Sequence, residues 1–376
     1  MKIILSGGGT GGPVTPLLAI TEKLKSSNKN IDFLWLGTKK GMEQKMVKNA
    51  NLKFQAIYSG KFRRYFSFKN IIDLFFIKLG FFQSLWKIFK FKPDIILTAG
   101  GFVAVPVVWA GWFLRIPILA HQQDVKVGLA NKLMAPFATI ITCSLEKSVN
   151  DFNKKKKVYF TGNAIRDKII NTKIIKSETN APLLTKEGVD KAPPLYKGGQ
   201  GGVLNFKNNL PTILILGGGT GSKAVNTIIV QALPKFANFC NVIHITGENK
   251  KNHCSENPNY HQFQFLPNIE EAFASADLVI TRAGMGVLSE LSILGKPTII
   301  IPIPDSHQEL NANYFADRKS AIVLAQKKLT SEILSDNIKK ILSDENKQKE
   351  LSKNIKNIMP ADGAHKIADI ILKEIK

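Results

Sequence analysis

Short apolar runs alternate along the chain with longer segments in which apolar residues recur at helical spacing, a pattern typical of parallel βαβ units. In the first half, strands are expected over residues 3–6, 33–36, 95–98, 116–120, 140–142 and 158–162. In the second half they are expected over residues 213–216, 242–246, 278–281, 298–301 and 321–324. The 376 residues are enough for two hydrophobic cores. We therefore predict an α/β protein with two Rossmann-like, doubly wound parallel-sheet domains that face a cleft.

The segment between the two sets of strands has no sustained period. Residues 176–208 are dense in Pro, Gly, Lys and Asn, which predicts a flexible insertion. We expect an N-terminal domain over residues 1–164 and a C-terminal domain over residues 165–357. The last residues, about 358–376, have the spacing of a short amphipathic helix.

A glycine-rich turn follows the first expected strand. Gly7, Gly9 and Gly12 fit the G-x-G-x-x-G pattern between a strand and a helix, where backbone N–H groups and the helix dipole favour a pyrophosphate. The second strand ends in Gly37 and Thr38, without the acidic residue that a nicotinamide-binding unit needs for its ribose hydroxyl. A dehydrogenase is therefore disfavoured. Taken alone, these glycines are also compatible with a tight turn that binds nothing.

A second glycine-rich turn, GGGTG at residues 217–221, follows the first strand of the second set. It resembles a Walker A loop, but Ser222 stands at the second glycine position and Ala224 stands where a magnesium-binding hydroxyl is required. A nucleoside triphosphatase is therefore disfavoured. The presence of one such turn in each domain favours phosphate binding over a purely structural turn.

The formal charge of +23 comes mainly from lysine, since only six of the 52 basic residues are arginine. Base readout and bidentate phosphate contacts favour arginine, and the sequence shows no arginine cluster with stacking aromatic residues. We expect a solvated, lysine-rich surface and no nucleic-acid partner.

Cysteine usage indicates a reducing compartment. Cys143, Cys240 and Cys254 lack the spacing of a disulfide framework or a metal knuckle. The first apolar run is too short for a secretory signal, which favours the cytoplasm. The sequence contains no Asp-x-Asp motif, and the histidines of the second half lack a ligand spacing. We expect no required metal and no cofactor.

Seven segments occur in the order and rough spacing of one known family. They are GGTGGPVTPLLAI, AGGF, HQQDVKVGLANKLMA, GNAIR, GGGTGS, TRAGMGVLSELSILGKPTIIIPIP and HQELNA. The chain resembles the MurG family of GT-B glycosyltransferases over nearly its whole length, apart from residues 176–208. The resemblance implies an inverting, metal-independent transfer of N-acetylglucosamine from UDP-N-acetylglucosamine to the undecaprenyl-diphosphate-linked muramyl-pentapeptide, lipid I, which gives lipid II in peptidoglycan synthesis.

The resemblance also implies a peripheral protein at the cytoplasmic face of the bacterial cell membrane, and a C-terminal helix that returns to the first domain. An alternative is another GT-B enzyme that uses a UDP-sugar with a different acceptor. Such an enzyme would not need the aromatic and basic stretch at residues 62–93, which favours the lipid acceptor.

Glu290 is the strongest candidate in the second domain. A strand that ends at Thr281 is followed by a glycine turn and a helix, and a carboxylate on this helix can accept hydrogen bonds from both ribose hydroxyls. The resemblance adds, as further substrate contacts, Arg166, Gly219, Thr220, Leu266, Met285, Gly286, Ser289 and Gln308. Arg166 is equally suited to a hinge salt bridge, and Gly219 stands where the family commonly has serine.

In the first domain the resemblance points to Thr10, Gly11 and Gly12 as contacts to the sugar or to the acceptor pyrophosphate. The family's first loop usually ends in a histidine that is suspected of a catalytic role. This chain has Pro13 there, which offers no proton acceptor.

The family's HEQN motif also changes in this chain, to His121, Gln122, Gln123 and Asp124. An inverting transfer needs a group that takes a proton from the attacking hydroxyl. We therefore offer Asp124 as the base, or as a residue that helps His121 in this role. The alternative is that Asp124 only accepts a hydrogen bond from the donor sugar.

Residues 62–93 predict a helix with a broad apolar face. Its expected membrane contacts are Ile72, Phe75, Leu79, Phe82, Trp86, Lys87 and Lys90. Small and polar residues, among them Gly80 and Ser84, form a narrow opposite side. The helix lacks the apolar run needed to span a bilayer, and its basic residues suit an anionic membrane surface. Packing of half of this face on the first sheet is the alternative, and burial explains a second candidate at residues 107–114 equally well.

Overall fold

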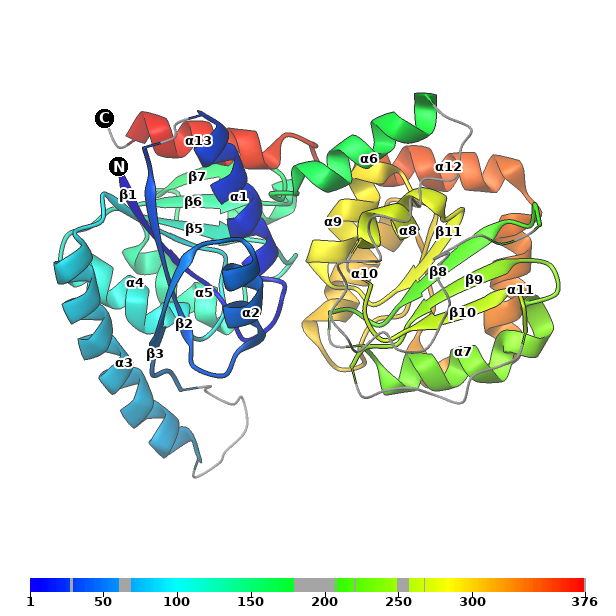
Figure 1. Cartoon of the computed structure of the whole chain (residues 1–376), viewed down its shortest axis with the longest axis horizontal. Helices are drawn as coiled ribbons and strands as arrows, with labels where there is room; N and C mark the ends of the chain where they lie inside the picture. Colours follow the sequence, from blue (N-terminus) through cyan, green and yellow to red (C-terminus); the bar gives the residue numbers. More distant parts are fainter. Residues whose placement is uncertain are drawn as a thin grey trace. The chain divides into compact units, whose positions relative to one another are not determined.

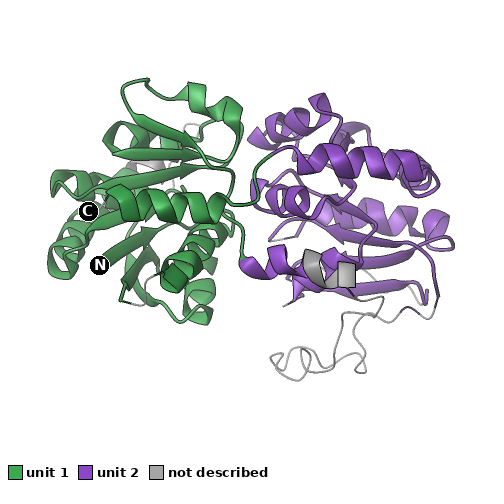
Figure 2. Cartoon of the chain, turned by 90° about the horizontal axis from the view of Figure 1, so that it is seen from above, with its two compact units in different colours: residues 1–166, 359–376 green, residues 167–358 purple. Residues whose placement is uncertain are grey.

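The computed structural model describes residues 1–27, 30–60, 69–178, 206, 208–219, 221–248, 257–266 and 268–374. They form two compact units, each built on one parallel β-sheet (Figure 1). Unit 1 comprises Met1–Arg166 and Met359–Lys376, so both chain termini belong to it (Figure 2). Unit 2 comprises Asp167–Ile358. Most of the insertion expected at residues 176–208 lies outside the described residues, although a helix continues to Glu178.

Unit 1 contains seven parallel strands in the order β3-β2-β1-β4-β5-β6-β7. They are β1 Lys2–Ser6, β2 Asp32–Thr38, β3 Lys53–Ile57, β4 Ile95–Thr98, β5 Ile118–Gln122, β6 Ile140–Cys143 and β7 Lys157–Phe160. The chain runs outward from β1 in one direction to β3 and then, from β4, in the other. The turns that follow β1 and β4 are therefore neighbours at the carboxyl edge of the sheet, where α/β proteins bind ligands.

Helices cover both faces of this sheet (Figure 1). They are α1 Val14–Ser27, α2 Met42–Asn49, α3 Lys69–Phe91, α4 Ala104–Phe113, α5 Leu129–Met134 and α13 Gly363–Glu374, with the short helices η1 Ala135–Phe137 and η2 Glu146–Asp151. Alternate residues of β1 serve two cores, because side chains point to opposite faces of a strand. Ile3 and Leu5 pack with α1 and α13, whereas Ile4 packs with α4. The C-terminal helix thus completes the core of unit 1.

Unit 2 contains six parallel strands in the order β10-β9-β8-β11-β12-β13. They are β8 Thr212–Leu216, β9 Asn241–Ile245, β10 Tyr260–Phe263, β11 Leu278–Thr281, β12 Thr298–Ile300 and β13 Ile322–Val323. The helices are α6 Asp167–Glu178, α7 Lys223–Phe236, α8 Ile269–Ser275, α9 Met285–Leu294, α10 His307–Asp317, η5 Gln326–Lys328, α11 Ser331–Leu342 and α12 Glu345–Lys356. Here the order reverses between β8 and β11, which brings the turns after these two strands together.

The predicted α/β fold with two parallel sheets is confirmed, and every expected strand is present with small shifts of its ends. Two strands, β3 and β10, were not predicted. Both lie at an edge of their sheet and carry polar residues, as KFQAI and YHQF, with only part of each strand buried. Central parallel strands are buried on both faces and therefore appear in the sequence as apolar runs. Edge strands that are only partly buried carry polar residues, so they do not appear as apolar runs.

Candidate active site

Two glycine turns interlock at the carboxyl edge of the first sheet. A Cβ on Gly101, in the AGGF turn after β4, would collide with the backbone oxygen of Gly8, in the turn after β1. Gly9 has a φ of +86°, and a Cβ there would lie 2.6 Å from the ring of Phe102. Only glycine fits at these positions. The first turn is therefore held in one conformation against its neighbour.

The predicted contacts Thr10, Gly11 and Gly12 lie where this turn enters α1. Gly11 O accepts hydrogen bonds from the N–H groups of Val14 and Thr15, at 3.0 and 3.1 Å, which begins the helix. Thr10 is exposed, and Gly11 and Gly12 are half-buried. These residues therefore present backbone N–H groups at the positive end of a helix, which suits an anion.

His121 ends in a buried network at the carboxyl end of β5. Its side chain is fully buried, with Nδ1 2.9 Å from Thr142 Oγ1 and Nε2 3.0 Å from Asn163 Oδ1. Burial lowers the pKa of His121 to about 4, against the opposing effect of these two hydrogen bonds. A neutral ring with both nitrogens engaged holds β5, β6 and the segment after β7 together. It has no nitrogen left to take a proton from a substrate.

The two glutamines after His121 are also structural. Gln122 Nε2 donates to Asp124 O at 2.7 Å, and Gln123 Nε2 donates to Ala99 O at 3.1 Å, which ties this loop to the AGGF turn. Asp124 is half-buried, so it is the side chain among the four that is partly open to solvent. The structure thus brings Asp124 and the first glycine turn to the same edge of unit 1.

The second glycine turn, residues 217–221, leads into α7. Gly221 has a φ of +69°, and its Cβ would collide with Thr246 O, so glycine is required there. A Cβ on Gly219 would meet nothing within 4 Å, so the serine common in the family would fit. Ser222 is the N-cap of α7, and its Oγ accepts from Val225 N. The predicted contact Thr220 lies outside the described residues.

Arg282 lies directly after β11 and is a buried cation next to Ser222, which follows the second turn. The sequence analysis did not predict a role for this residue. Its guanidinium donates to Ser222 Oγ at 2.8 Å and to Gln326 Oε1 at 2.6 Å, as well as to the carbonyls of Ile301 and Pro302. It forms no ion pair with a described carboxylate, and its Nε has no hydrogen-bond partner among the described residues. Burial lowers its pKa. An arginine that follows an apolar strand next to a glycine turn was the available signal.

The helix α9 carries several predicted donor contacts. It begins after Gly284, and Glu290 is 8% exposed on its second turn. Met285 is almost fully buried and Gly286 is half-buried. Ser289 is fully buried, and its hydroxyl donates to Met285 O at 2.6 Å within the helix. The Ser289 hydroxyl proton is therefore engaged within α9, and Glu290 is the one ionisable residue of this helix.

Three further predicted contacts have less specific surroundings. Gln308 lies in the first turn of α10, and its Oε1 accepts from Ile303 N at 3.2 Å, beside the end of β12. Leu266 is buried in the segment after β10. Arg166 is half-buried at the end of the first part of unit 1. The structure thus places Gly219, Glu290 and Gln308 after β8, β11 and β12 of one sheet.

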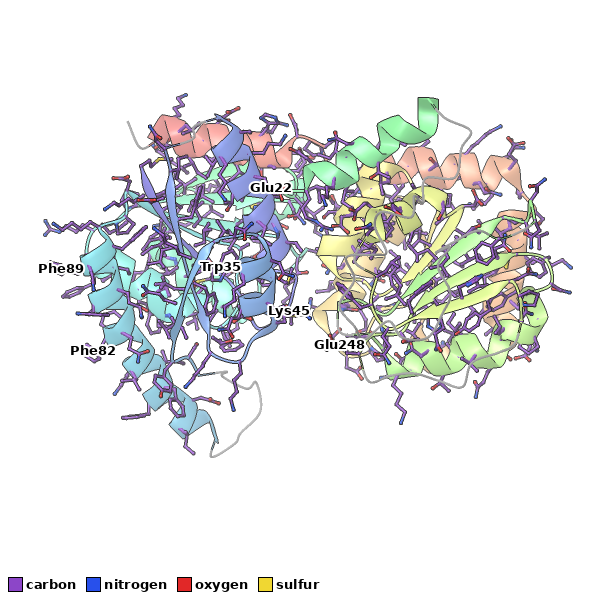
Figure 3. The ribbon with its side chains drawn as sticks, viewed as in Figure 1. Glu22, Trp35, Lys45, Phe82, Phe89 and Glu248 are labelled. Atoms are coloured by element: carbon purple, nitrogen blue, oxygen red, sulfur yellow. The ribbon has the colours of Figure 1, made fainter. Side chains whose placement is uncertain are left out.

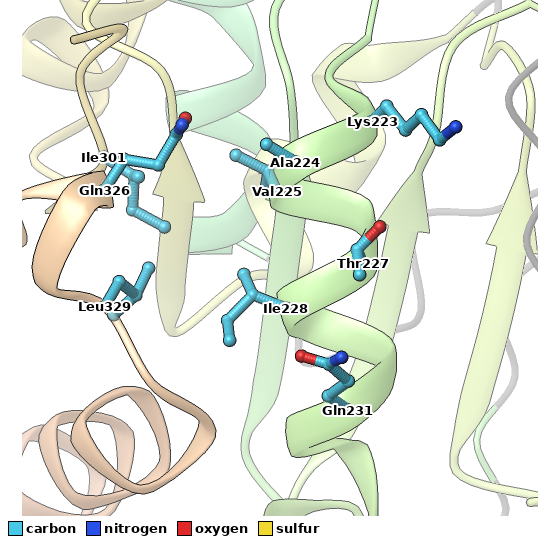
Figure 4. A pocket seen from close by; sticks show the side chains of 9 residues that line it. All are labelled: Lys223, Ala224, Val225, Thr227, Ile228, Gln231, Ile301, Gln326 and Leu329. Atoms are coloured by element: carbon cyan, nitrogen blue, oxygen red, sulfur yellow. The ribbon is translucent and has the colours of Figure 1, made fainter.

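A pocket of about 580 Å³ lies in unit 2 between α7 and η5 (Figure 4). It is lined by Lys223, Ala224, Val225, Thr227, Ile228, Gln231, Ile301, Gln326 and Leu329. It shares Gln326 with the hydrogen bonds of Arg282 but contains none of the predicted substrate contacts. In the described ranges, no three His, Cys, Asp or Glu side chains are grouped so as to hold a metal ion.

Helix α3 exposes large aromatic residues on the outer side of unit 1. Phe75, Phe82, Trp86 and Phe89 have exposed fractions of 60% to 70%, and Ile72 is also exposed. Phe82 and Phe89 point away from the body of the unit, whereas Trp35 lies in its interior (Figure 3). Lys87 and Lys90 lie with their Nζ atoms 5.7 and 5.3 Å from the Trp86 ring. Leu79 is half-buried.

The narrow side with Gly80 and Ser84 is the side of α3 that faces the protein. A Cβ on Gly80 would collide with Tyr58 O, and the fully buried Ser84 donates to Gly80 O at 2.7 Å. Small residues thus let α3 approach closely and leave its aromatic side outward. Trp112 and Phe113 of α4 are exposed as well, so the candidate at residues 107–114 is only partly explained by burial. None of the described helices combines the length and hydropathy needed to cross a membrane.

Comparisons with known proteins agree with this architecture. Residues 3–143 match the glycosyltransferase family 28 N-terminal domain, and residues 212–368 match the glycosyltransferase family 28 C-terminal domain. The UDP-N-acetylglucosamine–N-acetylmuramyl-(pentapeptide) pyrophosphoryl-undecaprenol N-acetylglucosamine transferase of Clostridium kluyveri is 34% identical, over 99% of both chains. The protein of the same name from Legionella pneumophila strain Paris is 32% identical, over 99% of this chain and 97% of its own.

Solved structures show the same fold. MurG from Acinetobacter baumannii aligns with a TM-score of 0.72 at 22% identity, over 99% of each chain. The UDP-GlcNAc 2-epimerase from Neisseria meningitidis bound to UDP-GlcNAc aligns with a TM-score of 0.69 at 15% identity, over 99% of this chain and 100% of its own. These likenesses establish a GT-B architecture, and the full-length sequence identity assigns the relationship: the chain is a glycosyltransferase that belongs to the MurG family.

Proposed function

We propose that this chain transfers N-acetylglucosamine from UDP-N-acetylglucosamine to an undecaprenyl-diphosphate-linked muramyl-pentapeptide, with inversion at the anomeric carbon. The observation that carries the proposal is the identity of 34% and 32%, over almost the whole chain, to relatives that bear this activity in their names. The two glycine turns, one at the carboxyl edge of each sheet, support it because both substrates contain a diphosphate.

The donor is assigned to unit 2. The UDP diphosphate would be held by the N–H groups of the turn at residues 217–221 and by the N-terminus of α7. Arg282 adds a buried positive charge that no described carboxylate neutralises. Glu290 would accept the ribose hydroxyls, the backbone near Leu266 would contact uracil, and Gln308 would contact the sugar.

The acceptor diphosphate is assigned to the N–H groups of Thr10, Gly11 and Gly12. The attacking sugar hydroxyl forms the new bond to the anomeric carbon of the donor, the bond from that carbon to the UDP oxygen breaks, and UDP leaves with its electron pair. Asp124 is the proposed base that takes the hydroxyl proton, since His121 is buried and neutral. The helix dipole of α7 and Arg282 stabilise the charge on the leaving UDP without a required metal.

The aromatic side of α3 is proposed to insert into an anionic membrane surface, with Lys87 and Lys90 at the headgroups. This surface supports a lipid acceptor over a soluble one, and a peripheral location at the cytoplasmic face of the bacterial membrane. The rest of this protein's surface is rich in lysine, so an exposed aromatic cluster of this size indicates a binding surface.

The test is a turnover assay with radiolabelled UDP-N-acetylglucosamine and a lipid-linked muramyl-pentapeptide, with and without EDTA. Transfer of label to the lipid that is unaffected by EDTA is the expected result. Saturable binding of the UDP-sugar without transfer to this lipid would overturn the acceptor assignment and favour a different acceptor. Loss of transfer in EDTA that added metal restores would overturn metal independence.

A further inference from the structure

A carboxylate lies buried directly beneath the first glycine turn. Glu43, in the first turn of α2, is fully buried. Its Oε1 accepts from Thr38 N at 2.9 Å and from Thr38 Oγ1 at 2.5 Å, and its Oε2 accepts from Gly9 N at 3.3 Å. The carboxylate thus joins the end of β2 to the turn after β1.

The surrounding backbone makes room for this side chain. A Cβ on Gly8 would lie 2.5 Å from Glu43 Cδ, and a Cβ on Gly41 would collide with the Glu43 oxygens. Glu43 forms no ion pair with a described lysine or arginine. Three hydrogen-bond donors alone therefore compensate the loss of hydration, which is costly for a buried charge. An apolar residue would fill this space without that cost, so packing does not explain a carboxylate here.

The bond to Gly9 fixes the direction of the turn. Because the Gly9 N–H points inward to Glu43, the following N–H groups are left for another acceptor. In the described part of the chain, the N–H groups of Thr10, Gly11 and Gly12 donate to no other residue. We propose that Glu43 is a positioning residue for the acceptor: it holds Gly9 so that the next three N–H groups face the acceptor diphosphate. This inference rests on the proposed acceptor site at the first turn.

Two effects of Glu43 on a diphosphate oppose each other. Its negative charge repels the ligand, whereas its hydrogen bond to Gly9 orders the donors that bind the ligand. Order dominates in this proposal, because the dipoles of the three donors point their positive ends at the carboxylate and offset part of its field. Removal of the carboxylate should therefore weaken acceptor binding even though it removes a repulsive charge.

The experiment compares Glu43→Ala and Glu43→Gln with Glu22→Gln, which changes an exposed glutamate on α1. KM for the lipid acceptor, KM for UDP-N-acetylglucosamine and kcat are measured, with hydrogen exchange of a peptide that covers residues 7–13. Glu43→Ala should raise the acceptor KM about tenfold or more, leave the donor KM within about twofold, and speed exchange in this peptide. Glu43→Gln should give a smaller increase, because one amide oxygen replaces two acceptors.

Global destabilisation would lower the active fraction and the apparent kcat, but it would not raise the acceptor KM while the donor KM stays unchanged. The difference between the two KM values is therefore specific to positioning. If Glu43→Ala does not fold, Glu43→Gln decides the question alone. A lower acceptor KM in Glu43→Gln would show that repulsion dominates and would overturn the inference. An unchanged acceptor KM would do the same.

Gly11→Asp separates this inference from the acceptor site on which it rests. A Cβ there has its nearest neighbours at 4.0 Å, and the added charge should repel a bound diphosphate. A higher acceptor KM in Gly11→Asp with no change in either Glu43 variant defeats the inference alone. No change in Gly11→Asp defeats the acceptor site, and the inference with it.

Discussion

The aromatic side of α3 gives a membrane-binding prediction whose size follows from the structure. Phe82 and Phe89 have exposed fractions of 65% and 70%. With about 200 Å² for a phenylalanine, each exposes roughly 130 to 140 Å². Full insertion at about 25 cal/mol per Å² would contribute about 3 kcal/mol for each ring. An interfacial helix inserts only part of its face, so we take about half of this value, or about 3 kcal/mol for the pair.

The double variant Phe82→Ser/Phe89→Ser should therefore bind vesicles about 100-fold more weakly, since every 1.4 kcal/mol is about tenfold. The assay is sedimentation with phosphatidylglycerol-containing vesicles, and the matched control is Ile333→Ser, an exposed apolar residue on α11 of unit 2. Turnover with a water-soluble acceptor analogue should stay unchanged. Vesicle binding within about threefold of the unsubstituted protein, with unchanged thermal unfolding, would refute this use of α3.

Three further predictions concern the site and its buried histidines. Asp124→Asn should lower kcat about 100-fold or more and keep UDP-sugar binding, whereas near-normal turnover with the same pH dependence would rule out its role as base. Gly219→Ser should lower the donor KM severalfold, which corresponds to about 1 kcal/mol of donor binding, because the added Cβ has space and the serine hydroxyl can donate to phosphate. A higher donor KM would contradict this prediction. Burial lowers the pKa of both His121 and His244 to about 4. Below a pH of about 6.5 the unfolded chain therefore binds more protons at these histidines than the folded chain does. The free energy of unfolding should fall as the pH falls from about 6.5 to 4. Urea denaturation should show that the free energy of unfolding is lower at pH 5 than at pH 7 by about 2 kcal/mol for each histidine. His121→Gln should reduce this difference between the two pH values, whereas His365→Gln, which changes an exposed histidine, should not.

The sequence predicted the parts of the fold that depend on local pattern. Central strands such as β4 and β11 are apolar runs, and each glycine turn directly follows such a strand. The orientation of α3 depends instead on a long-range contact, the approach of Gly80 to Tyr58. Helical periodicity identifies two sides of a helix but does not say that the small side faces the protein. Periodicity therefore left packing of half of the broad apolar side on the sheet as an alternative to membrane contact, and the structure shows that Phe75, Phe82 and Trp86 of this side are exposed.

The candidate site divides in the same way. The glycine turns and Glu290 belong to motifs that are continuous in sequence, and they were predicted. Glu43 contacts Gly9 of the first turn, and Arg282 contacts Ser222 directly after the second turn, across 34 and 60 residues of sequence. Each is an ordinary charged residue in its own segment, and only the folded sheet brings it to a turn. Buried partners of this kind are set by tertiary contacts that a single sequence does not display.

The charges beneath the two turns differ, and this difference agrees with the proposed division of roles. Gly9 of the first turn contacts a buried carboxylate, Glu43, whereas Ser222, directly after the second turn, contacts a buried guanidinium, Arg282. In the proposed reaction the acceptor diphosphate remains intact, so extra positive charge at its site would strengthen binding but would not stabilise a charge that develops in the transition state. The donor bond breaks at the diphosphate, where negative charge develops on the leaving UDP, and a fixed cation there lowers the barrier. Two similar strand–turn–helix units thus supply unlike electrostatic environments, and the cation lies in the unit assigned to the leaving group.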